Sequence, residues 1–245
     1  MPSPSSGAAT IDAGAMRYAD ATVEVRPTTG DGPGPVIFHR RQTVGWPVRL
    51  EATSPAGDRV VLRPLTAEDE PAYLTLRREN AAWLAPWDAT QPNPAEPGRT
   101  YTQMLRTVDE EADAGRALPF GIEVGGSLAG QVNLSNIVMG SFRSCNAGYW
   151  IARAVAGRGV MPTALAAAAD HAFFTVGLHR LEVNIRPENA ASLAVVRKLG
   201  LRDEGIRERY LHIAGSWCDH RSFAVTVEEL DGGRLADRLT APNTP

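Results

Sequence analysis

The segment Gly148-Tyr149-Trp150-Ile151 and the turn Ala156-Gly157-Arg158-Gly159-Val160-Met161 that soon follows it decide the fold of this chain. The first segment is an apolar run that fits the end of a strand, and the second opens an alanine-rich helical stretch over 160–176. Glycines let a backbone approach a ligand closely, and a helix start presents unpaired N–H groups and a partial positive charge. This order predicts a phosphate or pyrophosphate site, although the same glycines also fit a plain turn.

Composition limits the classes of function. The chain has 245 residues, enough for one large or two small domains with a buried core. Its net charge of −3 gives no reason to expect direct binding to nucleic acid. It contains no run of about 18 apolar residues, so we expect no membrane-spanning segment.

Cysteine and histidine spacing argues against a metal or redox site. Cys145 and Cys218 lie far apart, and the five histidines form no ligand pattern. We therefore expect no bound metal and two reduced thiols. A secretion signal has a basic segment followed by an apolar stretch. The N-terminus of this chain shows no such pattern, so we expect a cytoplasmic protein.

Composition also suggests the domain boundaries. Residues 1–45 are rich in Gly, Pro, Ser, Thr and Ala without any period, which is typical of a flexible N-terminal tail. The folded domain is expected over 46–230. Residues 231–245 are expected to form a loose C-terminal tail. The oligomeric state stays open, a homodimer included.

Hydrophobic periodicity and turn residues predict the elements that precede the glycine turn. Thr66-Ala67-Glu68-Asp69 resembles a capping box and opens a helix to about Asn80, with Tyr73, Leu74 and Leu76 as its inner positions. A second helix is expected over 98–114. Strands are expected over 48–51, 60–63, 119–124, 127–138 and 144–151.

The elements after the turn complete a mixed sheet. The strand expected over 181–185 is separated from the strand over 144–151 by a helix, so the two should be parallel neighbours. Asn189 caps a short helix that ends at Gly200. Two last strands are expected over 201–213 and 217–227. The predicted fold is an α/β mixed sheet of about seven strands with helices on both faces.

Over residues 58–230 these elements and motifs resemble the GCN5-related N-acetyltransferases (GNAT), and within them the RimJ/RimL type that acetylates protein N-termini. Together and in this order the motifs are highly specific. They are Arg63-Pro64-Leu65, Glu79-Asn80, Trp83-Leu84-Ala85-Pro86-Trp87, Gly148-Tyr149-Trp150-Ile151, Gly157-Arg158-Gly159, His179-Arg180-Leu181-Glu182, Arg186-Pro187-Glu188-Asn189-Ala190-Ala191-Ser192, Lys198-Leu199-Gly200-Leu201, Glu204-Gly205, Tyr210 and Trp217-Cys218-Asp219-His220.

The resemblance implies acetyl-CoA as donor, with its pyrophosphate on the N–H groups of the glycine turn. It also implies that the central parallel strands splay apart, so that the pantetheine arm pairs with exposed backbone. Ala154 stands where the family usually has Gln or Arg, which removes one side-chain contact. The implied donor-binding residues are Trp150, Ile151, Arg153, Ala156, Gly157, Arg158, Gly159, Val160, Met161, Asn189, Ser192 and Arg197.

The implied reaction is direct attack of an amine on the thioester in a ternary complex. Ser192 matches the position of the proton donor to the leaving thiolate; it also fits a polar residue that assists the Asn189 cap. Tyr210 is a second candidate acid, or else a core tyrosine. Glu208 could relay a proton from the amine through water, or form a surface ion pair with its arginine neighbours.

The acceptor groove of the family matches the region of Asn80, Trp83 and Trp87, with Asn133 and Ser135 facing it from a strand. Two tryptophans in one short segment can line a pocket for a peptide end, and they can equally pack against the core.

Three functions remain open at this point. The first is acetylation of the N-terminal α-amine of a protein, such as a ribosomal protein. The second uses the same donor on a small-molecule amine such as an antibiotic or metabolite, and the third is a CoA-binding module without catalysis. Dinucleotide binding is excluded because Pro162 stands where a third glycine belongs, and the sequence contains no nucleotide-hydrolase phosphate loop.

Overall fold

A computed structural model describes residues 45–93, 95–96 and 98–240 of the chain. The predicted N-terminal tail, apart from its last residue, lies outside the described residues, as does the end of the predicted C-terminal tail. No described helix has both the length and the apolar character that a membrane crossing requires.

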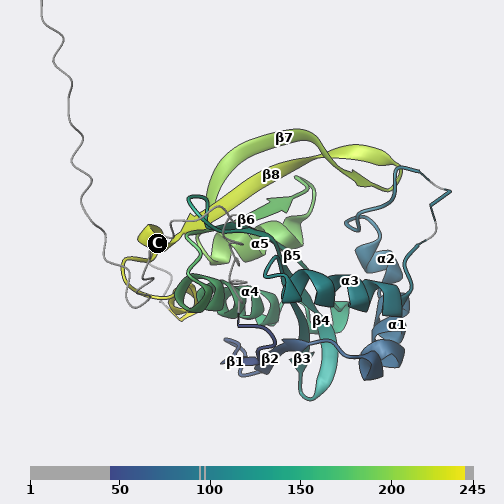
Figure 1. Cartoon of the computed structure of the whole chain (residues 1–245), viewed down its shortest axis with the longest axis horizontal. Coiled ribbons are helices and arrows are strands. Elements are labelled where there is room, and N and C mark those ends of the chain that lie inside the picture. Colours follow the sequence, from purple (N-terminus) through teal and green to yellow (C-terminus); the bar gives the residue numbers. More distant parts are fainter. Residues whose placement is uncertain (1–44, 94, 97, 241–245) are drawn as a thin grey trace, which may run out of the picture. The chain divides into compact units, whose positions relative to one another are not determined.

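One eight-stranded sheet runs through the described domain in the order β1-β2-β3-β4-β5-β6-β8-β7 (Figure 1). The sequence predicted a sheet of about seven strands; the structure has eight, and β1 at the sheet edge corresponds to the strand expected over 48–51. All neighbours are antiparallel except β5 and β6, which confirms the predicted parallel pair. The strands are β1 Leu50–Thr53, β2 Arg59–Pro64, β3 Leu118–Val124, β4 Ser127–Val138, β5 Ser144–Ile151, β6 Arg180–Ile185, β7 Arg202–Ile213 and β8 Ser216–Thr226.

Local signals set the helix ends. The capping box of Thr66 and Asp69 is present and opens a 3-10 turn that leads into α1. The prediction that Leu74 faces inward is wrong: its side chain is 48% exposed, because it lies on the outer face of α1. The helices are α1 Glu70–Glu79, α2 Ala81–Leu84, α3 Tyr101–Asp113, α4 Val160–His171 with a π-helical continuation Ala172–Val176, and α5 Ala190–Lys198.

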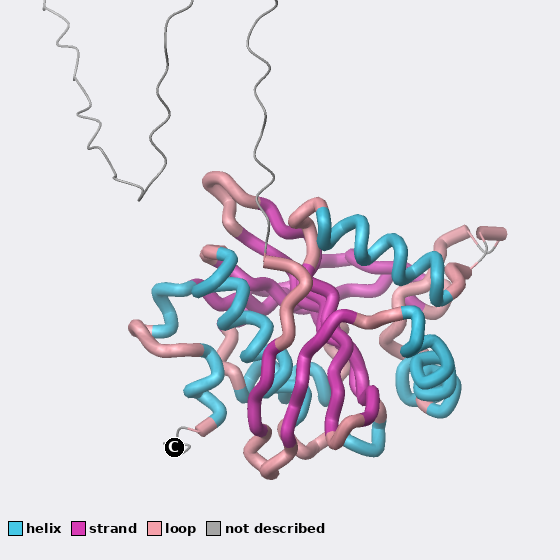
Figure 2. Tube along the Cα trace, turned by 60° about the horizontal axis from the view of Figure 1, so that its bottom comes forward, coloured by secondary structure: helices cyan, strands magenta, loops and turns pink. Residues whose placement is uncertain are grey.

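The two faces of the sheet carry different helices, as predicted (Figure 2). On one face, α4 and α5 pack on apolar side chains such as Val132 and Leu134 of β4 and form the main core. The alternate residue Gln131 lies on the other face, where it accepts a hydrogen bond from Trp150 Nε1 at 2.9 Å. Tyr73 of α1 packs edge-on against Trp150, so α1 covers this second face.

The central parallel pair opens along its length. β5 and β6 pair only from Ser144↔Arg180 to Asn146↔Glu182, although β5 continues to Ile151 and β6 to Ile185. Beyond the last pair the facing edges of the two strands are therefore not hydrogen-bonded to each other. This is the splayed pair that the family resemblance implied.

The described chain stays ordered past residue 230. Residues Leu235–Leu239 form a 3-10 helix that packs on α4, and Leu235 is fully buried. The carboxylate of Asp170 accepts hydrogen bonds from the backbone N–H groups of Leu235 and Ala236. This buried contact over a long sequence separation makes 235–239 part of the domain, where the sequence suggested a loose tail.

Candidate active site

A cleft of about 690 Å³ lies where β5, the glycine turn and α5 meet. It collects segments that are far apart in sequence, including most of the predicted donor-binding residues and both predicted acceptor-site tryptophans. It is lined by Trp83, Leu84, Trp87, Asp88, Tyr149, Trp150, Ile151, Val155, Ala156, Gly157, Gly159, Met161, Pro162, Asn189, Ala191, Ser192, Ala194, Val195, Arg197 and Lys198.

The glycine turn has the backbone that its sequence predicts. Gly157 and Gly159 both have a φ of +81°, which side-chain-bearing residues rarely adopt. A Cβ on Gly159 would lie 2.8 Å from Cδ of Pro55, so this glycine is also required by packing. A Cβ on Gly157 would meet no heavy atom within 4 Å and would enter the cleft instead. The turn thus leaves bare backbone beside the start of α4, as a diphosphate cradle needs.

The predicted cations differ in their placement. Arg197 lines the cleft together with Lys198. Arg158 forms an ion pair with Asp58 in the β1–β2 turn. Arg153 lies over the ring of Trp83, with Cζ 5.9 Å from the ring centroid. The structure therefore brings the α5 cations to the cleft wall, whereas Arg153 and Arg158 do not line it. Val160 is buried, so only its backbone can serve a ligand.

Ser192 and Asn189 lie at the start of α5. Oδ1 of Asn189 accepts a hydrogen bond from the backbone N–H of Ser192 at 3.0 Å, which confirms the predicted cap. The Tyr149 hydroxyl donates to the carbonyl of Ser192 at 3.4 Å, and burial raises the pKa of Tyr149 well above its usual value. Within the described residues the hydroxyl of Ser192 has no hydrogen-bond partner. Ser192 is one of the residues that line the cleft.

Trp83 and Trp87 both line the cleft. Nε1 of Trp83 donates to the carbonyl of Ile151 at 3.1 Å, so this carbonyl at the end of β5 already has a partner. Arg186 lies over the ring of Trp87 and donates to the carbonyl of Pro86 at 3.1 Å. These contacts fix both indoles as cleft walls.

Asn80 has a different environment from the one the sequence predicted. It is buried; its Nδ2 donates to the carbonyl of Leu76 and its Oδ1 accepts from the backbone N–H of Arg153, both at 2.8 Å. The side chain connects the end of α1 to the turn that follows β5. It does not line the cleft.

Asn133 and Ser135 lie on the α1 face of β4, opposite Gly148 and Asn146 in the register. Neither lines the cleft. Oδ1 of Asn133 is buried, and among the described residues it has no hydrogen-bond partner.

The far side of the strand opening carries the candidate acid Tyr210 together with Asn184, which was not among the site residues predicted from the sequence. Asn184 donates to the hydroxyl of Tyr210 at 3.3 Å and to Glu182 at 3.0 Å, and accepts from the Ser222 hydroxyl at 2.6 Å. The alternation of Glu182 and Asn184 with apolar residues on β6 could have indicated this. Because Tyr210 accepts from Asn184, its own O–H remains available to donate.

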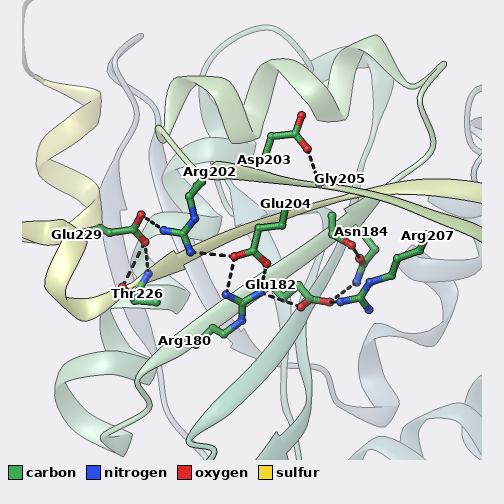
Figure 3. A network of polar contacts seen from close by, with 11 residues as sticks. Arg180, Glu182, Asn184, Arg202, Asp203, Glu204, Gly205, Arg207, Thr226 and Glu229 are labelled. Atoms are coloured by element: carbon green, nitrogen blue, oxygen red, sulfur yellow. Dashed lines mark hydrogen bonds and ion pairs between the residues drawn. The ribbon is translucent and has the colours of Figure 1, made fainter.

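A charged network fixes the strands that carry this pair (Figure 3). Glu204 on β7 is paired with Arg180 and Arg202, which lower its pKa to about 2. Arg180 and Arg207 also contact the buried carboxylate of Glu182. These pairs tie β7 to β6 on the same face as Tyr210.

Other candidate acids and bases lie away from the cleft. Glu208 is 75% exposed and pairs with Arg209 at 3.6 Å, which matches the surface ion pair considered as its alternative role. His220 is buried beside the ring of Tyr210 and bonds the carbonyl of Cys218, and burial lowers its pKa. In the described range no group of three or more His, Cys, Asp or Glu residues could hold a metal ion.

Comparison with known proteins agrees with this geometry. A sequence model described as "Acetyltransferase (GNAT) domain" matches residues 59–202. The "[Ribosomal protein uS5]-alanine N-acetyltransferase" of Escherichia coli (strain K12) is 32% identical over 179 residues, covering 72% of this chain and 92% of that protein. A "Probable N-acetyltransferase YjcK" of Bacillus subtilis (strain 168) is 28% identical over 171 residues, with 69% and 94% coverage.

Solved structures of acetyltransferases share the fold of this chain. "Mycobacterium smegmatis RimJ in complex with CoA-disulfide" superposes with a TM-score of 0.74 and 37% identity, covering 80% of this chain and 95% of that one. The self-immunity acetyltransferase MccE in complex with acetyl-CoA and AMP shares the fold, with a TM-score of 0.62 and 17% identity over 70% of this chain and 94% of that one.

Proposed function

Because the chain belongs to the GNAT acetyltransferases, we propose that its acceptor is the N-terminal α-amine of a protein, in particular a ribosomal protein. The enzyme is an N-acetyltransferase that uses acetyl-CoA as donor. With such an acceptor, its place of action would be the cytoplasm.

The observation that carries the proposal is one cleft that extends from the glycine turn to the unpaired end of β5. The cleft contains Gly157 at the start of α4, Ser192 on α5 and the two tryptophans of the acceptor-side wall. A diphosphate at the turn would direct the thioester toward the opening. An amine that enters from the α1 face could then meet it there.

The charge of the cleft favours a peptide end over a polycationic drug. Among the residues that line it, Asp88 is the one carboxylate, and it is paired with Arg77. Arg197 and Lys198 add positive charge at the α5 wall. A polycation would find little compensating charge in this cleft.

Amine chemistry also fits an N-terminus. At pH 7.5 roughly a third of a free α-amine is neutral, against about 0.1% of a lysine side chain, because their pKa values are about 7.7–8.0 and about 10.4. An α-amine therefore needs little help to lose its proton. This agrees with the absence of a carboxylate base among the cleft-lining residues, apart from the paired Asp88.

The residues then have separate roles. The donor supplies an activated acetyl thioester. The glycine turn orients its diphosphate, and Trp83 and Trp87 limit the acceptor entrance. Ser192, or Tyr210 across the opening, donates the proton that the departing thiolate gains. Glu208 is too exposed to act without a chain of waters.

The decisive test measures thiol release from acetyl-CoA with matched acceptors. One peptide begins with a free alanine, a second has the same sequence with a formylated N-terminus and an internal lysine, and the third acceptor is an aminoglycoside. Turnover confined to the free α-amine is expected. Turnover with the aminoglycoside alone would overturn the proposal, and donor binding without turnover of any amine would indicate a non-catalytic module.

A further inference from the structure

Gly148 is a glycine that neither backbone strain nor packing requires. Its φ lies outside the left-handed region, and a Cβ on it would meet no heavy atom within 4 Å beyond its chain neighbours. Two other glycines of the sheet are different. A Cβ on Gly121 would lie 2.6 Å from Leu65 Cδ2, and one on Gly130 would lie 2.3 Å from the Trp150 carbonyl.

A glycine inside a strand weakens it and often marks a place where a ligand approaches the backbone. Gly148 is in the interior of β5, a central strand of the sheet, and yet it is exposed. Open space in the middle of a sheet is unusual where helices cover both faces. Something other than folding therefore accounts for the missing side chain.

The position of Gly148 relative to the strand opening suggests why this residue has no side chain. The last paired residues are Asn146 on β5 and Glu182 on β6, and two residues further along come Gly148 and Asn184. Extending this register places Gly148 level with Asn184 on the unpaired part of the two strands. Asn184 holds the hydroxyl of Tyr210.

Strand alternation shows which face this space belongs to. Ala147 and Tyr149 point to the α4–α5 face, since Ala147 is in the main core and Tyr149 contacts Ser192 of α5. Gly148 shares the opposite face with Trp150, which packs against Tyr73 of α1. The open space at Gly148 therefore lies on the α1 face of the sheet, and α4 and α5 cover the other face.

We propose that Gly148 is a specificity-determining residue whose missing side chain makes room for the first residue of the acceptor, with its α-carbon substituent, while the amine attacks the thioester. The inference rests on the proposed function above. In the attack the nitrogen–carbon bond forms as the carbon–sulfur bond breaks. The proton that the amine gives up is balanced by the proton that the thiolate gains.

The test uses Gly148→Ala and Gly148→Val with two peptides that differ only in beginning with glycine or alanine. The added methyl should compete with the side chain of the alanine peptide, so its kcat/KM should fall by about 10- to 200-fold in Gly148→Ala. The glycine peptide should lose much less. Gly148→Val should impair both, because the larger side chain fills the space even for glycine.

Three measurements distinguish a steric effect on the acceptor from damage to the fold. Thermal unfolding of Gly148→Ala should occur at the wild-type temperature or slightly above, and its affinity for CoA should be unchanged. Gly98→Ala, which adds a methyl group in the loop before α3 and outside the cleft lining, should leave both peptides unaffected. An equal loss for both peptides in Gly148→Ala, or no loss for either, overturns the inference. Failure of the wild type to acetylate either peptide would count instead against the proposed function.

Discussion

The indole of Trp83 and the backbone of Ile151 are joined by a hydrogen bond, with Nε1 3.1 Å from the carbonyl oxygen. Trp83 belongs to helix α2, whereas Ile151 ends strand β5, and both residues line the cleft. The bond therefore fixes two parts of the cleft wall relative to each other, and its removal should affect both stability and donor binding.

Trp83→Phe keeps an aromatic ring and removes the indole N–H that donates this hydrogen bond. A hydrogen bond contributes about 0.5–1.5 kcal/mol, so Tm should fall by about 1–6 °C and acetyl-CoA affinity by less than about tenfold. Thermal unfolding and calorimetric titration measure these effects. The control Trp217→Phe changes a 56% exposed indole and should alter neither. An unchanged Tm in Trp83→Phe would show that the bond does not hold the strand end.

Asn80→Ala should act mainly on stability. It leaves the backbone N–H of Arg153 and the carbonyl of Leu76 without their side-chain partner, at a cost of about 1–3 kcal/mol in the free energy of unfolding. Urea denaturation measures this cost, and Asn93→Ala in the exposed loop serves as the control. If the acceptor KM rose strongly while stability stayed at the wild-type value, Asn80 would instead contact the acceptor, as the sequence predicted.

Gly157→Val should abolish donor binding because its side chain would enter the cleft beside the start of α4. Gly232→Val is the matched control, since Gly232 has the same φ of +81° and equally open surroundings but does not line the cleft. Both variants carry similar backbone strain, so their Tm values should fall alike. Titration with acetyl-CoA should detect binding only in Gly232→Val. Normal binding by Gly157→Val would refute the assignment of the glycine turn as the diphosphate site.

Ser192→Ala and Tyr210→Phe separate the two candidate acids. General acid catalysis raises a reaction rate by about 10²–10⁴-fold. Because a thiol has a pKa of about 8.5, the thiolate leaves without much help from an acid, so the effect should be at the low end of this range. The variant that removes the acid should lose kcat by about 10²-fold with CoA affinity unchanged. Steady-state kinetics and titration decide between them. Wild-type kcat in both variants would leave neither residue as the acid.

Glu204 should make stability depend on pH in acid. Arg180 and Arg202 hold its pKa at about 2 in the folded protein, against 4.5 for an ordinary glutamate. A lowered folded-state pKa stabilises above the unfolded pKa, so this contribution is complete above about pH 4.5 and is lost as the pH falls toward about 2. Glu204→Gln should lower stability at pH 7 and flatten the profile between pH 5 and 3, as measured by urea denaturation. Glu208→Gln, at an exposed position, should follow the wild type.

The sequence was sufficient for features that depend on near neighbours. The glycine turn, the Thr66 capping box, the Asn189 cap and the parallel pair follow from residues a few positions apart or from the order of elements. Each is confirmed because backbone geometry at these positions has few alternatives.

The directions of the side chains on β7 could not be predicted from the sequence. Alternation would place Glu208 and Tyr210 on one face, but the register of β7 and β8 shifts between Arg207 and Leu211, and Arg209 has a φ of +49°. Such irregularities break the period of two. Tyr210 consequently meets Asn184, while Glu208 points to solvent.

What the sequence alone determined is the family, the order of elements and the backbone of the glycine turn, because these depend on local backbone preferences and on motif spacing. Only the tertiary structure decided which residues share the site. Asn80 bonds Arg153, Arg158 pairs with Asp58, and Asn184 donates to Tyr210. Each of these partners is tens of residues away, and their contact depends on how the helices and strands pack, which no local pattern encodes.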